Sequence, residues 1–273
     1  MTSSPCPGEA PAGGRYGEGL FEPERAGEAD RIDAAALVYD PVTTARLRAL
    51  GAGPGMRCLE VGAGTGTVAR RLVEEAGVDE VVALDRDTGA LDGLAGPRLR
   101  VMAGDLTDEG LEPGVFDLIH ARFVLMHLPE RRRIVSRLAG WLAPGGRLVL
   151  ADAVELPDVL DTSSAYRRTM DAMWQALRAT IGTDISGVPG YPHMLREEGL
   201  REVGAEVYCP PLVAGGPLAR FWSETWSRMR PELVATGRVD DAVIDEALAC
   251  LASPLLAELG PGMAMAWGRR PPG

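Results

Sequence analysis

Three acidic residues follow short apolar runs, at positions where their side chains could bind a ligand. Glu60 lies two residues before the glycine-rich stretch GAGTG, Asp85 ends the run EVVALD, and Asp105 follows the run RLRVM by a few residues. A carboxylate beside the glycines would repel a diphosphate and favour a cationic ligand. The other two carboxylates could accept hydrogen bonds from ribose hydroxyls and from an exocyclic amine such as that of adenine. The three acids together predict a site for a cationic ligand that contains adenosine.

The glycines at positions 62, 64 and 66 predict a turn whose backbone can approach a ligand closely. The dinucleotide fingerprint G-x-G-x-x-G would require glycine at position 67, where Thr67 stands. Because Glu60 would also repel a pyrophosphate, the pattern disfavours an NAD-dependent oxidoreductase.

The three histidines of the chain are the candidates for a general base. His127 follows an apolar run and is predicted to be the base or the residue that positions the acceptor, with a packing role as the alternative. His120 lies inside that apolar run, which favours a structural role. His193 could reach a ligand from a lid, although a lone histidine at a helix start is more often an exposed cap.

The elements that must position these residues alternate between apolar runs and helical patterns. Buried strands are predicted at 56–61, 80–85, 98–102, 115–121 and 146–154. Five strands separated by helices predict a parallel sheet that is covered on both faces and binds ligands at the carboxyl ends of its strands. A helix and a strand are predicted within 191–209, and a final strand at 262–270.

Two helical patterns carry further expectations. Asp40 as N-cap, Pro41 as first helical residue and Gly51 as the stop signal predict one helix that leads into the sheet. Another helix has arginines at 131–133 and 137 opposite an apolar stripe, and we expect these arginines to face solvent.

Five motifs occur in the order CLEVGAGTGTVARRL, VVALDRD, MAGDLTD, FDLIHARFVLMHLPE and LAPGGRLVLADAV. As a set they resemble the class I S-adenosylmethionine-dependent methyltransferases, over about 41–154. The lead at 16–51 and the terminal AWGRRP resemble a group of actinobacterial small-molecule methyltransferases of secondary metabolism, such as antibiotic biosynthesis. The resemblance implies a Rossmann-like α/β fold whose seven-stranded, mostly parallel sheet has an antiparallel last strand, helices on both faces and an inserted helical cap.

With this fold, the chain divides into segments with different expected roles. They are a mobile tail at 1–19, a cofactor-binding methyltransferase core at 20–154, helical cap insertions at 155–190 and 213–256, a core continuation at 191–212, and a final core strand with the C-terminus at 257–273.

The resemblance also implies which residues bind S-adenosylmethionine and its product S-adenosylhomocysteine. Glu60 and the glycine stretch would hold the methionine part, Asp85 the ribose and Asp105 the adenine amine. A backbone carbonyl at 121 or 122 would accept from the cofactor ammonium, and the tail around Tyr16 would close over the cofactor. The predicted cofactor residues are Tyr16, Glu60, Gly62, Ala63, Gly64, Gly66, Asp85, Arg86, Gly104, Asp105, Leu106, Ala121 and Arg122.

The acceptor is expected to bind among the aromatic residues of the added helices, which could line an apolar chamber. The predicted acceptor residues are Tyr39, Met126, Asp152, Trp174, Tyr191, His193 and Trp222. Packing in the core is the alternative for the tryptophans, and exposure to solvent is the alternative for Asp152.

Charge and composition narrow the partners. A formal net charge of -11 argues against nucleic acid, which calls for basic surfaces. Four scattered cysteines suggest neither a metal site nor disulfides, which fits the cytoplasm. No apolar stretch approaches the roughly 18 residues of a membrane span. We expect a small-molecule acceptor and no membrane partner, with a homodimer left open.

The expected activity is methyl transfer, by in-line displacement, to an oxygen, nitrogen or carbon of a small aromatic or hydrophobic secondary metabolite. Positioning and desolvation can supply most of the acceleration of such a step. The alternative is a protein of the same fold that binds S-adenosylmethionine and assists a non-methylating reaction such as a cyclisation.

Overall fold

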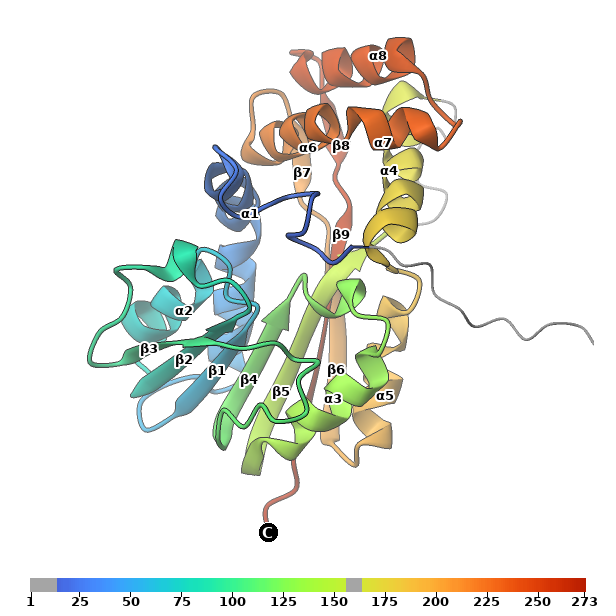
Figure 1. The fold of residues 1–273 in the computed structure, drawn as a ribbon. Coiled ribbons are helices and arrows are strands. Elements are labelled where there is room, and N and C mark those ends of the chain that lie inside the picture. The colour runs from blue at the N-terminus through green and yellow to red at the C-terminus, as the bar shows by residue number, and fades with distance from the viewer. Residues whose placement is uncertain (1–13, 156–163) are drawn as a thin grey trace, which may run out of the picture.

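The computed structural model describes residues 14–155 and 164–273, arranged around one seven-stranded sheet (Figure 1). The strand order is β3-β2-β1-β4-β5-β9-β6. Their bounds are β1 Arg57–Val61, β2 Glu80–Asp85, β3 Leu99–Ala103, β4 Phe116–Arg122, β5 Leu142–Val154, β6 Arg201–Tyr208 and β9 Gly262–Arg269. The first five strands pair in parallel, whereas β9 runs antiparallel to both β5 and β6. This confirms the predicted Rossmann-like sheet.

Both faces of the sheet are covered because its central strands are apolar on both sides. In β1, Cys58 packs in a core cluster with residues of α1 (Glu28–Ala49) and α2 (Thr67–Arg71). The next residue, Leu59, packs in a second cluster with residues of α3 (Arg131–Gly140) and α5 (Tyr191–Glu197). Alternate side chains of a strand point to opposite faces, so one short strand joins both layers.

The first helix begins earlier than the sequence predicts. Its predicted N-cap, Asp40, lies in the second half of α1 and accepts hydrogen bonds from Arg122 at 2.6 Å and Arg71 at 3.3 Å. Pro41 cannot donate to the carbonyl of Leu37, but that residue is 61% exposed. Water can therefore satisfy the free carbonyl, and burial of the preceding turns holds the helix together.

Short helical turns interrupt the connections between the main elements. After α2 the chain continues as a π-helical turn, η1 (Leu72–Ala76), which ends at left-handed Gly77. The others are η2 (Gly89–Leu91), η3 (Leu125–His127) and η4 (Val188–Gly190).

One of the arginines predicted to face solvent, Arg131, is only 7% exposed and pairs with Asp184 at 3.1 Å. For this residue the prediction was wrong.

Four further helices stand above the carboxyl ends of the strands (Figure 1). They are α4 (Ala165–Ile181), α6 (Pro217–Arg228), α7 (Arg230–Ala235) and α8 (Asp241–Ala252), with a two-stranded sheet of β7 (Pro211–Val213) and β8 (Ala257–Leu259). Here α6 packs on α1 and α4 packs on α8, around the fully buried Trp226. No helix in the described part of the chain is long and apolar enough to cross a membrane.

Candidate active site

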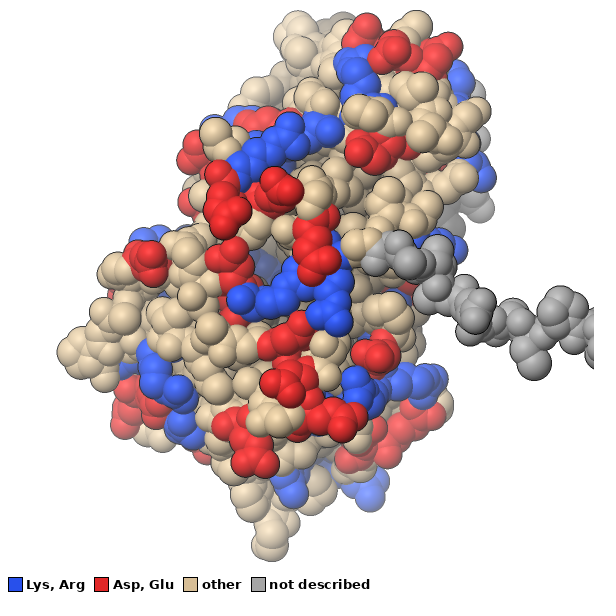
Figure 2. Space-filling view, viewed as in Figure 1, with Lys and Arg blue, Asp and Glu red and all other residues tan. Residues whose placement is uncertain are grey.

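A cavity of about 730 Å³ lies at the carboxyl ends of β1, β2 and β4, where the strand order reverses. Doubly wound sheets bind ligands at this point because the loops from β1 and β4 diverge there. The glycine loop, α1 and the tail at 14–17 line one part of it, and α4 and α6 line another. Figure 2 shows basic side chains gathered at the centre of this face, between acidic ones.

The glycine loop can form only because its glycines adopt left-handed backbone angles. Gly62 and Gly64 have φ values of 63° and 56°, which cost little without a Cβ atom. A Cβ atom at Gly62 would overlap the side chain of Val124 in the loop after β4. The backbone of Gly64 donates to the Asp85 carboxylate at 2.7 Å, so the end of β2 fixes the loop of β1.

Two carboxylates at this edge differ in their surroundings. Burial raises the pKa of Asp85, against the effect of the backbone N–H of Gly64. At Asp105, partial burial is outweighed by hydrogen bonds from the N–H and hydroxyl of Thr107 and by the charge of Arg15, and its pKa is lowered. Arg15 itself reaches Asp105 at 2.5 Å.

Glu60 lines the cavity from β1 and forms a buried pair with His120 of β4. The two residues lie directly opposite in the parallel strands, and His120 Nδ1 is 2.7 Å from the Glu60 carboxylate. Within the described residues no partner contacts His120 Nε2. The structural role predicted for His120 is therefore to hold Glu60 in place.

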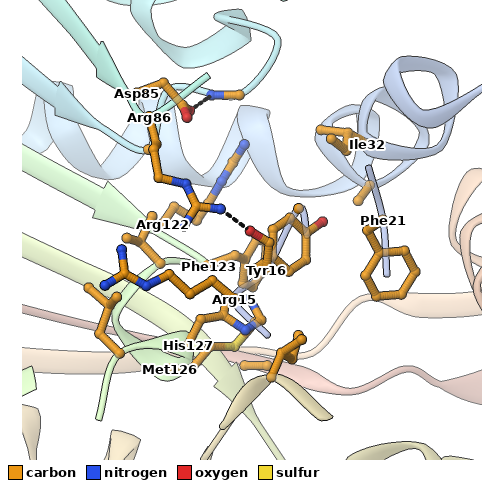
Figure 3. Close-up of a pocket in the computed structure, with 18 of the residues that line it drawn as sticks. Arg15, Tyr16, Phe21, Ile32, Asp85, Arg86, Arg122, Phe123, Met126 and His127 are labelled. Atoms are coloured by element: carbon orange, nitrogen blue, oxygen red, sulfur yellow. Dashed lines mark hydrogen bonds between the residues drawn. The ribbon is translucent and has the colours of Figure 1, made fainter. Parts of the chain in front are cut away.

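The tail residue Tyr16 lies across the cavity (Figure 3). Its backbone carbonyl accepts a hydrogen bond from Arg86 at 2.5 Å, and its hydroxyl accepts one from Arg31 at 3.0 Å. Its ring lies 4.7 Å from the ring of His127, between centroids. Residues 1–13 of the predicted tail lie outside the described part of the chain.

The loop after β4 forms the opposite wall and carries His127. Phe123 is left-handed, with φ of 57°, and its N–H donates to the carbonyl of Ala151 in β5. His127 Nδ1 lies 2.8 Å from the hydroxyl of Thr183, just beyond the end of α4. Burial, with a smaller contribution from the charge of Arg131, lowers the pKa of His127 to about 3.

The far part of the cavity is aromatic. Tyr39, Phe123, Trp174, Phe221 and Trp222 line it, and Trp174 and Trp222 meet edge to face with centroids 6.5 Å apart. This part is enclosed by α1, α4 and α6.

Comparison with known proteins identifies the part of the chain that surrounds the glycine loop. Residues 59–148 match the family model of the methyltransferase domain. This region is therefore similar to methyltransferase domains. The match begins in β1 and ends in β5, and so includes the glycine loop and the loop of His127.

Curated proteins that are similar to the chain match only part of it. Phosphoethanolamine N-methyltransferase 3 of Arabidopsis thaliana is 28% identical over 56% of this chain and 30% of its own length. Demethylmenaquinone methyltransferase of Beutenbergia cavernae is 40% identical over 40% of this chain and 45% of its own length. The chain thus spans less than half the length of both relatives.

Among solved structures, the fold is similar to phosphoethanolamine N-methyltransferase 2 of Haemonchus contortus in complex with S-adenosyl-L-methionine. The TM-score is 0.58 at 16% identity, over 91% of this chain and 59% of that chain. At this identity the likeness shows the fold alone.

Most predicted cofactor residues meet at this one cavity. Those that line it are Tyr16, Glu60, Gly62, Ala63, Gly64, Asp85, Arg86, Gly104, Asp105, Leu106 and Arg122. Gly66 and Ala121 do not: a Cβ atom at Gly66 would point at Leu94 behind the loop, and Ala121 is buried in the sheet.

Three predicted acceptor residues lie away from the cavity, and their assignment is corrected. Asp152 and Tyr191 are buried and hydrogen-bonded to each other between the sheet and α5. His193 lies on the outer surface of α5 and pairs with Glu197 at 3.1 Å. Each already has a protein partner. Tyr39, Met126, Trp174 and Trp222 do line the cavity, as does His127.

Sequence reasoning did not assign three residues that shape the site. Arg15 contacts Asp105, Arg31 contacts Tyr16, and Thr183 contacts His127. The first two contacts involve the tail, and the third joins two segments that lie far apart in the sequence. The only local signal was the position of Arg15 beside Tyr16 and of Thr183 directly after a helix-ending glycine.

Proposed function

We propose that the protein is a methyltransferase that moves the methyl group of S-adenosylmethionine to an oxygen, nitrogen or carbon of a small aromatic or hydrophobic molecule. The observation that carries the proposal is the convergence of Glu60, Asp85 and Asp105 on one cavity at the switch point of a methyltransferase domain. When bound, the cofactor would supply a methyl group activated by a sulfonium.

The residues of the cavity fit this cofactor chemically. Asp85 presents a carboxylate whose hydrogen bonds come from backbone N–H groups, which leaves lone pairs for ribose hydroxyls. Glu60 provides a buried negative charge near the glycine loop, which suits an ammonium or a sulfonium. On this proposal, Asp105 faces the adenine and Tyr16 covers the cofactor.

The charges of the cavity favour a neutral, hydrophobic acceptor. Each arginine of the lining is paired with a carboxylate: Arg15 with Asp105, Arg31 with Glu28, Arg86 with Glu18, Arg122 with Asp40 and Arg178 with Asp184. A phosphorylated acceptor would need basic groups able to bind its charge. The aromatic lining instead provides faces against which a planar molecule can pack. These features support a small, hydrophobic acceptor, and we propose further that it is a secondary metabolite methylated in the cytoplasm.

The first experiment measures ligand binding by calorimetry. We expect S-adenosylhomocysteine to bind and NAD not to bind. The double variant Glu60→Ala with Asp85→Ala should weaken S-adenosylhomocysteine at least about tenfold, because hydrogen bonds to charged groups are lost. Asp92→Ala, which removes a carboxylate outside the cavity lining, is the matched control. Binding of NAD alone would refute the proposal.

The second experiment asks whether the methyl group is transferred. Protein and S-adenosylmethionine with a labelled methyl are incubated with a metabolite extract of the source organism. A labelled small molecule is the expected product. Cofactor binding with conversion of a metabolite but no transfer of label would instead support the same fold assisting a non-methylating reaction.

A further inference from the structure

His127 has two ring nitrogens with different surroundings. Nδ1 is 2.8 Å from the hydroxyl of Thr183, whereas Nε2 has no hydrogen-bond partner among the described residues. Because His127 lines the cavity, Nε2 is the nitrogen left for a ligand. Which nitrogen carries the proton therefore decides whether this wall of the cavity donates or accepts a hydrogen bond.

Thr183 is held by backbone contacts on either side. Gly182 ends α4 in the left-handed conformation, with φ of 71°, and the N–H of Thr183 donates to the carbonyl of Leu177. The N–H of Asp184 donates to the carbonyl of Met126 at 2.7 Å. The segment after α4 is thus fastened to the η3 turn that carries His127.

The hydroxyl of Thr183 has only one place to donate its proton. The residue is 2% exposed, and in 14–155 and 164–273 the sole hydrogen-bond partner of the hydroxyl is His127 Nδ1. A buried hydroxyl that fails to donate costs about 1–3 kcal/mol. The hydroxyl therefore donates to Nδ1, and a neutral imidazole must then carry its proton on Nε2.

Burial, and to a smaller extent the charge of Arg131, lowers the pKa of His127 and keeps the ring neutral. Arg131 from α3 disfavours a second positive charge, the neutral Tyr16 ring covers one face, and Asp184 is engaged by Arg131 and by Arg178. With the pKa of His127 near 3, the imidazole is neutral at physiological pH and is a weak base.

We propose that Thr183 is a positioning residue that fixes His127 as the tautomer with a proton on Nε2, so that His127 donates a hydrogen bond to an oxygen of the acceptor. The inference rests on the proposed function and deepens it. The acceptor class becomes a planar, apolar enol or phenol that loses its proton to water and reacts as the enolate or phenolate. His127 stabilises negative charge on that oxygen and removes no proton.

The tautomer can be read directly by nitrogen NMR on protein labelled with ¹⁵N-histidine. The chain has only three histidines, and His127→Gln identifies the signals of His127. In the wild type we expect a protonated Nε2 and an unprotonated Nδ1. Thr183→Val should move a measurable fraction of the proton to Nδ1, and Thr183→Ser should restore the wild-type pattern. A wild-type ring protonated on Nδ1 would overturn the proposal.

Kinetics separate positioning from a general loss of structure. Thr183→Val should lower kcat about tenfold or more, because a weaker donor leaves a smaller fraction of the bound acceptor ionised, while the affinity for S-adenosylhomocysteine stays unchanged. Thr180→Val removes a hydroxyl that, within the part of the chain the structure describes, bonds only the carbonyl of Ala176 on the same helix, and it should change neither kcat nor affinity. Equal kcat in both variants would contradict a role for Thr183.

The pH profile supplies an independent readout. Because His127 is already neutral, we expect the kcat of the wild type to show no rising limb from this residue between pH 5 and pH 8. The NMR experiment needs neither cofactor nor acceptor, so its result stands even if methyl transfer is not observed. A failed transfer assay thus bears on the proposed function, and a wrong tautomer bears on this inference.

Discussion

Asp152 is a buried carboxyl group that serves the fold. It accepts a hydrogen bond from the hydroxyl of Tyr191 and another, of 3.2 Å, from the N–H of Met126. Burial nevertheless raises its pKa to about 7 from an ordinary 3.8. The folded protein therefore holds a proton on Asp152 at pH values where the unfolded chain has released it.

This difference predicts how stability depends on pH. From about pH 4 to pH 7 the folded state binds the proton and the unfolded state does not, so the free energy of unfolding falls as pH rises. Asp152 contributes up to about 1.4 kcal/mol per pH unit to that fall. Asp152→Asn should remove this contribution, as measured by chemical denaturation at pH 5 and pH 8.

The control is Asp92→Asn, which changes an exposed carboxylate. It should keep the wild-type difference in unfolding free energy between the two pH values. If Asp152→Asn retained the same difference, Asp152 would not be the group that titrates.

Side chains whose role depends on their own strand were predictable, and those whose role depends on a distant partner were not. Glu60 and Asp85 face the cavity because they end parallel strands, which local apolar runs indicate. Asp152 also ends an apolar run, yet Tyr191 of α5 occupies its carboxyl group. Nothing within the run distinguishes a ligand-binding acid from one bonded in the core.

At the scale of elements, the site is made by two loops that fit against each other. The glycine loop after β1 has no space for a side chain at Gly62 because Val124 of the η3 loop lies there. Glycine is therefore required at this position both for close packing of the two loops and for the left-handed backbone angle.

We predict that Gly62→Ala is more harmful than the same change at Gly93. Both glycines are left-handed, with φ of 63° and 83°, but a Cβ atom at Gly93 would meet no atom within 4 Å. Both variants should lose about 1 kcal/mol or more through backbone strain. Gly62→Ala should lose at least about 1 kcal/mol further through overpacking.

Chemical denaturation measures the two losses, and calorimetry with S-adenosylhomocysteine measures affinity. Affinity should fall only in Gly62→Ala, because Gly93 does not line the cavity. Equal stability and equal affinity of the two variants would show that the Val124 contact has no effect.

The strands and their carboxyl-end loops were predictable because their signals are periodic and local. The start of α1 was not, because the sequence offers a good cap at Asp40 and only the fold shows that two arginines occupy that carboxylate. Tertiary contacts thus override a local helix signal. The sequence predicted that aromatic residues line the acceptor pocket. Which tryptophans face the cavity depends on how α4 and α6 pack.

At the scale of the whole molecule, the tail ties the two sides of the cavity together. Arg15 reaches Asp105 beyond β3, Arg86 after β2 holds the Tyr16 carbonyl, and Arg31 of α1 holds the Tyr16 hydroxyl. The Arg15 and Arg86 contacts are largely exposed, so each is worth roughly 1 kcal/mol or less. The tail should therefore detach far more often than the domain unfolds.

We predict that Arg86→Ala releases the tail. It removes the hydrogen bond to Tyr16 and the ion pair with Glu18, and should speed trypsin cleavage after Arg15 about 3- to 10-fold, measured by mass spectrometry. Arg100→Ala, on the edge strand β3 and paired among the described residues with Glu80 alone, should leave the rate unchanged. Equal cleavage rates would mean that Arg86 does not restrain the tail.

The length of α1 has a consequence for how this cavity can change. Near its start, Arg31 bonds Thr225 of α6; further on, Asp40 pairs with Arg122 of β4; between them Ala35 and Ala36 face the cavity. One added residue would rotate everything beyond it by roughly 100° and break one set of contacts. Selection for a larger or smaller acceptor would therefore act on side chains such as these two alanines, through single substitutions, while the helix keeps its length.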